Sequence, residues 1–153
     1  KSHKIKILKT FLINSKDSEV DAQFEIENLS NQDICVWMGS EFNLSLLAGN
    51  SSDRYYIING EKPENSFLSS YGETSNIYEL SIIDKWSGVS IMIEASKIRD
   101  LWRFPIETVS QSEGGFERIY QQSCLLLHRK INITTDRKES FTIKDCEEKF
   151  EVS

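Results

Sequence analysis

Alternation of apolar and polar residues with a period of two runs through most of this chain. Val20, Ala22, Phe24 and Ile26 alternate with acidic and amide side chains over residues 20–27. This pattern is typical of an antiparallel strand with one face in the core and the other in water. A similar alternation over residues 4–13, with Ile5 and Ile7 against Lys4 and Lys6, predicts a further strand.

Further strands are predicted along the rest of the chain. Residues 33–49 are mostly apolar, which predicts a strand that is buried on both faces or bent near Gly39. Residues 95–102 have the composition for one helical turn. A four-residue turn, Lys85–Gly88, separates two apolar segments and predicts a hairpin. The remaining strands are predicted at residues 54–58, 77–84, 89–95, 124–133 and 139–145.

The spacing of these strands predicts the architecture. Strand centres about 8–15 residues apart are typical of a β-sandwich. The polar segment 59–76 carries turn signals at Asn59-Gly60 and Pro63 and is predicted to form no strand. We find no linker or internal repeat, so residues 1–153 are expected to form a single all-β antiparallel sandwich domain.

Composition and charge narrow the class of protein. A net charge of −6 argues against a nucleic-acid-binding surface and against an anionic membrane as partner. No apolar run approaches the roughly 20 residues of a membrane helix. A start at Lys1 without a signal-peptide pattern indicates a fragment or a processed product. The three cysteines are far apart in the sequence, which favours reduced thiols and a cytoplasmic protein.

An unusually polar stretch, LWRFPIETVSQSEGGFERIYQQS, covers residues 101–123. Gly114-Gly115 is a strong turn signal and predicts a two-residue hairpin there, although a longer loop over residues 110–115 fits nearly as well. In the two-residue hairpin Gln111 lies opposite Arg118, and Glu107 lies opposite Gln122. One sheet face would then carry Arg103, Glu107, Val109, Gln111, Arg118, Tyr120 and Gln122, and the other face Phe104, Ile106, Thr108 and Ile119.

The chemistry of this polar face allows three interpretations. Carboxylates, amides and guanidinium groups beside Trp102 and Tyr120 suit the hydroxyls and the apolar ring faces of sugars. The same groups also suit a structural network that holds two sheets together, or a docking surface for another domain. The residues alone favour the structural network and leave the other two interpretations open.

The polar stretch closely resembles the signature of the C-terminal β domain of glycoside hydrolase family 57, whose members include 4-α-glucanotransferases and α-amylase-like enzymes acting on α-1,4-glucans. SEFNLSLLAGNSSDRYY (residues 40–56) and LSIIDKWSGVSIMI (residues 80–93) resemble two further segments of that domain. The segments follow the family's order and cover about residues 24–127. The insert at residues 59–76 and the start at Lys1 depart from the family pattern, which leaves the particular enzyme undetermined.

The resemblance implies a sandwich of the galactose-mutarotase-like (supersandwich) type, seated against a catalytic (β/α) barrel of the parent chain. It places the nucleophilic glutamate and the acid aspartate in that barrel, outside this chain, so no catalytic residue, metal ligand or cofactor is expected here. The implied partners are that barrel and an α-1,4-glucan or maltooligosaccharide, and a homodimer stays open. The matching positions, as substrate-binding or domain-docking residues, are Glu41, Asn43, Trp102, Arg103, Glu107, Gln111, Glu113, Glu117 and Arg118.

Two other functions remain as alternatives to a bracing, non-catalytic accessory domain. A free-standing carbohydrate-binding module would expose aromatic residues in its own groove. A small mutarotase-like sugar epimerase would need a buried carboxylate and histidine acids, but the two histidines, His3 and His128, are expected to be solvated or structural. Among the three tryptophans, Trp37 is expected in the core, Trp86 in an exposed turn, and Trp102 is the first choice as a sugar contact.

Overall fold

The computed structural model describes residues 2–14, 16–97, 100–112, 114–135 and 137–149. Among them no segment is helical, so none has the long apolar helix that would cross a membrane. The strands are β1 (Ile5–Asn14), β2 (Glu19–Asn28), β3 (Ile34–Leu44), β4 (Arg54–Ile58), β5 (Gly72–Ser75), β6 (Glu79–Asp84), β7 (Val89–Ala95), β8 (Asp100–Ser112), β9 (Gly115–Ile133) and β10 (Lys138–Lys149).

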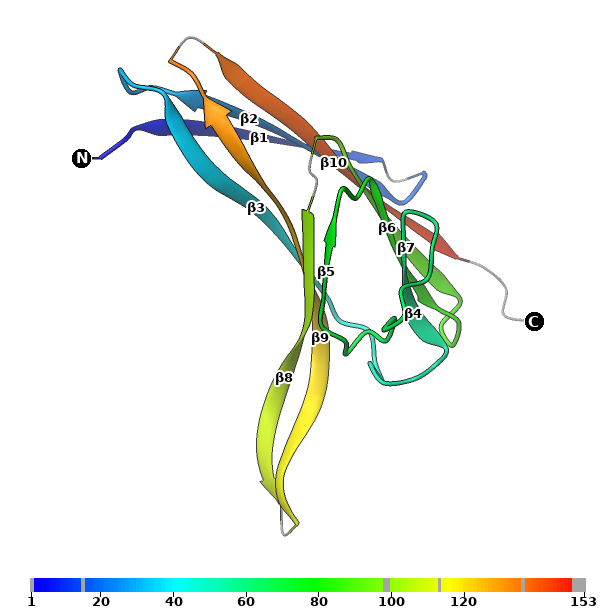
Figure 1. Cartoon of the computed structure of the whole chain (residues 1–153). Helices are drawn as coiled ribbons and strands as arrows, with labels where there is room; N and C mark the ends of the chain where they lie inside the picture. The colour runs from blue at the N-terminus through cyan, green and yellow to red at the C-terminus, as the bar shows by residue number, and fades with distance from the viewer. Residues whose placement is uncertain (1, 15, 98–99, 113, 136, 150–153) are drawn as a thin grey trace.

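The strands form two sheets. A six-stranded sheet has the order β1-β2-β10-β7-β6-β4, and a four-stranded sheet has the order β3-β9-β8-β5 (Figure 1). Neighbouring strands are antiparallel throughout both sheets. The prediction of an all-β antiparallel sandwich is therefore confirmed.

The core lies between the inner faces of the two sheets. Phe24 of β2 stacks on Phe141 of β10 with ring centroids 4.7 Å apart. Burial of each such side chain contributes about 1.5–3 kcal/mol before the entropy cost of ordering it. The other large buried side chains include Ile26, Tyr56, Leu80, Ile82, Ile93 and Ile143 from the six-stranded sheet and Leu101, Leu125, Leu127, Ile131 and Ile133 from the four-stranded sheet.

Several local predictions are confirmed. β2 buries Phe24 and Ile26 and turns its acidic side chains outward. β6 and β7 form a hairpin around the turn Lys85–Gly88. The Asn59-Gly60 pair forms a tight turn, because Ile58 and Glu61 exchange both backbone hydrogen bonds at 2.8 and 3.0 Å. Both turn residues have positive φ, +52° and +81°, as such turns require.

Other predictions are wrong, and each for a local reason. The strand predicted over residues 4–13 forms as β1, but its alternation does not correspond to a buried face, since β1 is exposed along its whole length. β3 is not buried on both faces; its burial alternates, and one face lies open. The helical turn over residues 95–102 does not form, because its ends belong to β7 and β8, while residues 98–99 lie outside the described residues. β5, inside the polar segment 59–76, was missed.

The hairpin of β8 and β9 differs from its predicted register. Ser112 pairs with Gly115, which shifts the turn one residue earlier than the Gly-Gly pair. A bulge then makes Gln121 an extra residue, since Ile106 pairs with Gln122 but Glu107 pairs with Tyr120. The bulge moves Gln122 to the opposite face from Glu107, so this part of the predicted polar face is wrong.

Beyond the bulge the two strands leave the sandwich and project from it (Figure 1). We call residues 107–112 of β8 and 115–120 of β9 the arm. Val109 and Phe116 lie on one of its faces and are 63% and 81% exposed. No described strand of the six-stranded sheet pairs with the arm.

Candidate functional site

Trp102 and Arg103 are neighbours in the sequence and point to opposite faces of the four-stranded sheet. Strand alternation turns Arg103 inward with Leu101 and Leu125, which are fully buried. It turns Trp102 outward, opposite Glu73 of β5 and Leu126 of β9. The polar stretch of the sequence is therefore not one surface.

Arg103 forms a buried structural network. Its side chain is 5% exposed, and its guanidinium donates to the carbonyl oxygen of Asn65 at 2.7 Å and to the hydroxyl of Ser70. The guanidinium lies 5.0 Å from the ring centre of Tyr56. Gly72 packs directly against it, since a Cβ there would lie 2.5 Å from Nε. Arg103 thus ties the loop between β4 and β5 to β8 and is closed to a ligand.

Burial in this network shifts the pKa values of Tyr56 and Arg103. Burial raises the pKa of Tyr56 to about 12, and the hydrogen bond to Ser123 opposes that rise only in part. The Tyr56 hydroxyl and the Ser123 hydroxyl both donate to the carbonyl oxygen of Leu68, at 3.2 and 3.0 Å. Burial likewise lowers the pKa of Arg103. These groups are held by one another, as expected of polar side chains in a core.

Among the sequence-predicted residues of the arm, Gln111, Glu117 and Arg118 are exposed and Glu107 is half-buried. Arg118 reaches Glu107 at 3.5 Å, and the Arg118 side chain is 71% exposed. Gln111 lies opposite Phe116, and Glu117 lies on the other face of the arm from Glu107. Glu107 and Glu117 therefore do not face each other as a glycosidase pair would. Glu113 lies outside the described residues.

The outer face of the four-stranded sheet gathers aromatic side chains that the sequence keeps apart. Trp37 of β3 and Trp102 of β8 meet edge to face with ring centroids 5.5 Å apart, although β9 lies between their strands. Trp37 is 64% exposed, which contradicts its predicted place in the core. We call this pair of indoles the aromatic ledge.

His128 of β9 lies beneath the aromatic ledge. Its ring centroid is 5.2 Å from that of Trp37 and 4.3 Å from that of Trp102. The side chain is 5% exposed, and in the described part of the chain neither ring nitrogen has a hydrogen-bond partner. A buried imidazole without partners costs about 1–3 kcal/mol per unsatisfied group. His128 is therefore buried, not solvated, and its nitrogens are unused.

Glu41 and Asn43 extend the same outer face along β3. The amide of Asn43 donates to Oε1 of Glu41 at 2.7 Å, and both side chains are exposed. Behind them Cys124 is buried, and burial, followed by the nearby Glu41 carboxylate, raises the pKa of its thiol. The thiol is thus protonated at neutral pH, and Glu41 and Asn43 are the accessible polar groups.

A shallow hollow adjoins the aromatic ledge on the side of β5. Trp102 and Phe104 line it from β8, with Glu73 of β5 and the exposed Tyr71 just before β5. The outer face therefore carries a continuous series of aromatic rings with carboxylates at its edges.

Among the predicted site residues, the structure brings Trp102, Glu41 and Asn43 onto one face and separates them from Arg103 and the arm. Sequence analysis missed Trp37 and His128. A signal existed for Trp37, because it shares the period-two face of β3 with Glu41 and Asn43, whose polarity marks that face as open. No such signal existed for His128, because its burial depends on rings from two other strands.

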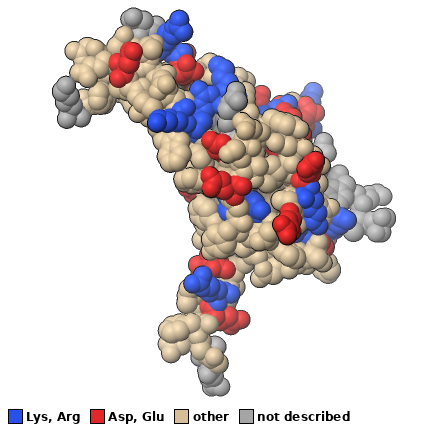
Figure 2. Space-filling view, in the orientation of Figure 1, with Lys and Arg blue, Asp and Glu red and all other residues tan. Residues whose placement is uncertain are grey.

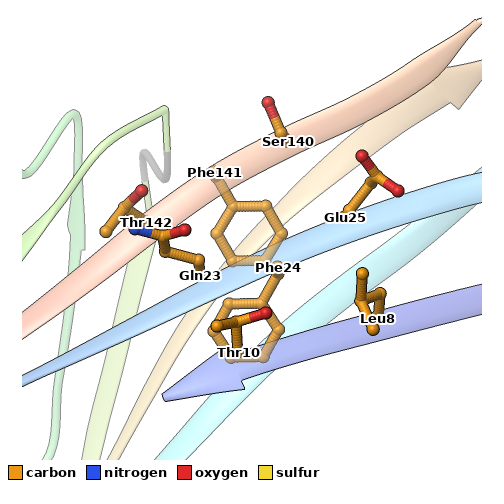
Figure 3. Close-up of a pocket in the computed structure, with 8 residues that line it drawn as sticks. All are labelled: Leu8, Thr10, Gln23, Phe24, Glu25, Ser140, Phe141 and Thr142. Atoms are coloured by element: carbon orange, nitrogen blue, oxygen red, sulfur yellow. The ribbon is translucent and has the colours of Figure 1, made fainter. Parts of the chain in front are cut away.

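A second hollow lies on the outer face of the six-stranded sheet. Leu8 and Thr10 of β1, Gln23 and Glu25 of β2, and hydroxyls of β10 line it (Figure 3). The register turns the stacked Phe24 and Phe141 rings toward the core. Its polar groups are solvated strand side chains, so the hollow offers fewer aromatic contacts than the aromatic ledge.

An epimerase site would need a carboxylate and histidines in one place. Burial, and then Glu147, raise the pKa of Asp145 in β10. His128, however, belongs to the other sheet, and His3 lies exposed near the N-terminus. Within the described residues, no three His, Cys, Asp or Glu side chains gather as a metal site requires.

Comparison with known proteins identifies the family. Residues 1–143 match the family model described as alpha-amylase/4-alpha-glucanotransferase, C-terminal. Alpha-amylase 1 of Dictyoglomus thermophilum is 36% identical over 141 residues, which are 90% of this chain and 19% of that protein. The chain thus spans about a fifth of the length of this relative.

Solved structures agree on the fold. A 4-alpha-glucanotransferase from Thermococcus litoralis superposes with a TM-score of 0.65 at 19% identity, over 94% of this chain and 18% of that one. A putative aldose 1-epimerase from Escherichia coli K12 gives a TM-score of 0.74 at 9% identity, over 97% and 62%. A galactose mutarotase-like protein from Clostridium acetobutylicum gives 0.68 at 14% identity, over 97% and 57%.

These solved structures confirm the galactose-mutarotase-like sandwich as the fold. Their sequence identities are too low to assign the activity of any of them to this chain. The family model and the 36% identical relative carry the assignment, because each covers nine-tenths of the chain or more. The chain belongs to the alpha-amylase/4-alpha-glucanotransferase C-terminal domain family.

Proposed function

We propose that this chain is a non-catalytic accessory domain of an α-glucan-acting enzyme of glycoside hydrolase family 57, in which it braces the catalytic barrel. Its family and the amylase relative, of which it matches only 19%, support a place within a larger enzyme. The carboxylates of the polar stretch support a non-catalytic role, because Glu107 and Glu117 lie on opposite faces of the arm.

The observation that carries the bracing role is the arm. Phe116 is 81% exposed near its end, and Val109 lies diagonally beside it on the same face. In Figure 2 charged side chains of the arm lie toward its base, and uncharged side chains lie beyond them. An apolar patch on a projecting hairpin, bounded by charges, has the composition of a protein-binding surface. Its occupant is the catalytic domain of the same polypeptide.

The bracing role is tested with the enzyme divided into this chain and its remaining polypeptide. Phe116→Ser should weaken the binding of this chain to that polypeptide about tenfold or more, because burying a phenylalanine is worth about 1.5–3 kcal/mol. Trp86→Ser is the matched control, since Trp86 is equally exposed but lies in the β6–β7 turn. Equal affinities for Phe116→Ser and the parent chain, measured by calorimetry, would contradict the proposal.

The proposal also covers where a glucan contacts this domain and in which cellular compartment the enzyme works. The outer face of the four-stranded sheet is where an α-1,4-glucan would contact the domain, and its exposed aromatic rings favour a carbohydrate-binding module as the second candidate function. The three scattered cysteines support a cytoplasmic enzyme. Maltoheptaose incubated with this chain alone should stay intact, and release of shorter sugars would refute the non-catalytic role.

A further inference from the structure

We propose that the outer face binds an α-1,4-glucan, with one glucose ring on the aromatic ledge of Trp37 and Trp102 beside His128, and with Glu41 and Asn43 as hydrogen-bonding groups for sugars further along the chain. The identity of the sugar rests on the proposed function, whereas the site rests on the geometry of the outer face. No residue of the arm takes part, so the glucan surface is separate from the bracing surface.

The first argument is the exposure of two tryptophans that meet each other. Trp37 leaves most of its large apolar surface in water. The other residues on the open face of β3 are Cys35, Gly39, Glu41 and Asn43, all of them smaller than tryptophan. Trp37 meets Trp102 edge to face. Exposed indoles suit the apolar face of a pyranose ring, because stacking removes their surface from water.

The second argument is the unsatisfied histidine. A neutral imidazole has one N–H donor and one acceptor nitrogen, and a sugar hydroxyl both donates and accepts. The His128 nitrogens are covered by the two indoles in this structure. A hydroxyl reaches them when the exposed Trp37 ring turns aside, and the hydrogen bond then removes the desolvation cost that the unliganded fold carries.

The third argument is the surface that leads away from the aromatic ledge. Gly39 follows Trp37 on the open face of β3, and its missing side chain leaves Leu126 as an apolar floor, since a Cβ there would lie 2.9 Å from the Leu126 side chain. Glu41 and Asn43 come next, about 13–20 Å from Trp37 at the rise of an extended strand. Their free oxygens suit vicinal hydroxyls, and the distance suits an oligosaccharide rather than a single sugar.

The test is calorimetric titration of this chain with maltoheptaose. Trp37→Ala should raise the Kd about tenfold or more without lowering the melting temperature, because the ring is mostly outside the core. Trp37→Tyr should recover most of the affinity, and Trp86→Ala on the other sheet should leave it unchanged. Cellohexaose, a β-linked glucan, should bind more weakly than maltoheptaose.

His128→Phe separates a binding role from a structural one. It should raise the melting temperature, because two buried unsatisfied nitrogens disappear, and it should weaken maltoheptaose binding. A lower melting temperature with unchanged affinity would make His128 a packing residue and remove it from the site.

Absence of binding at millimolar maltoheptaose, or equal binding by the parent chain and Trp37→Ala, would overturn the proposal. Equal binding of cellohexaose would overturn the assignment to an α-glucan. Either result leaves the bracing role standing, because that role depends on the arm and is measured through Phe116.

Discussion

The two faces of β8 place the neighbouring residues Trp102 and Arg103 in opposite environments. Arg103 faces inward, where Asn65, Ser70, Tyr56 and Gly72 enclose its guanidinium. Trp102 faces outward, where it contacts Trp37 and His128 and meets solvent. The inner face supplies partners for the terminal nitrogens of the guanidinium, although Nε of Arg103 has none among the described residues. The outer face leaves a large ring exposed, and in the described part of the chain both His128 nitrogens lack a partner. A motif that is continuous in sequence can therefore serve stability and recognition at alternate positions.

The largest expected effect that tests this comparison comes from Arg103→Met. Methionine fills similar space but removes the guanidinium, and with it the hydrogen bonds to Asn65 and Ser70 and the contact with the Tyr56 ring. The Ser70 hydroxyl keeps its own bonds to the carbonyl oxygens of Asn65 and Phe67. We expect the free energy of unfolding to fall by about 3 kcal/mol, measured by urea denaturation. Arg118→Met is the matched control, since Arg118 is exposed, and it should change stability by less than about 0.5 kcal/mol. Similar effects of the two substitutions would break the comparison.

A smaller effect is expected at the interior ion pair of Arg54 and Asp84. The Arg54 Nε lies 3.2 Å from Asp84 Oδ1, and both side chains are buried. Burial alone would raise the pKa of Asp84, but hydrogen bonds from the backbone and hydroxyl of Ser87, together with the Arg54 charge, outweigh it and hold the pKa below its usual value. Asp84→Asn should cost about 2 kcal/mol at neutral pH, because Arg54 keeps Asp53 as a partner.

The pH dependence of this pair follows from the lowered pKa of Asp84. Its contribution is complete above the ordinary aspartate pKa of about 4 and is lost as the pH falls through the lower folded-state pKa. The parent chain should therefore lose more stability than Asp84→Asn when the pH is lowered from about 5 to 2. Thermal melts of both proteins across that range measure the difference, and parallel curves would argue against a charged Asp84 in the fold.

The smallest effect is expected on the arm. Glu107→Ala removes a 3.5 Å pair with the exposed Arg118, which is worth about 0.5 kcal/mol at most after screening by solvent. Sequence analysis placed Glu107 and Arg118 on the same polar face, and the pairing of β8 with β9 keeps them on one face of the arm. A double-mutant cycle with Arg118→Ala measures the pair, and a coupling above about 1 kcal/mol would mean that the arm is more ordered than its exposure indicates.

Sequence alone predicted the sheet architecture well, because a period of two is local information. The Asn59-Gly60 turn and the β6–β7 hairpin followed from the same local rules. Local rules could not predict the bulge at Gln121, because a bulge depends on how β8 and β9 pair and has no fixed residue signature. One extra residue was enough to move Gln122 off the predicted polar face.

The site was predictable only in part. Trp102 lies on the outer face of its sheet, where a sugar contact would have to be, and its role there stays a prediction. Arg103, which the sequence placed on a polar surface, faces the core instead. Trp37 was assigned to the core because its neighbours are apolar. Burial depends on whether another layer covers a face, and the polar residues Glu41 and Asn43 on the face of Trp37 were the local sign that this face is open.

The edge strand β1 has a consequence for how the isolated chain behaves. It carries apolar side chains on both faces, including Ile7 and Phe11 on one and Leu8 and Leu12 on the other, and its outer backbone edge has no neighbouring strand within the described residues. Such an edge is a template for adding strands from other molecules. Solutions of the separated domain should therefore turn viscous or cloudy on concentration, and a lysine placed at Leu8 should keep them clear.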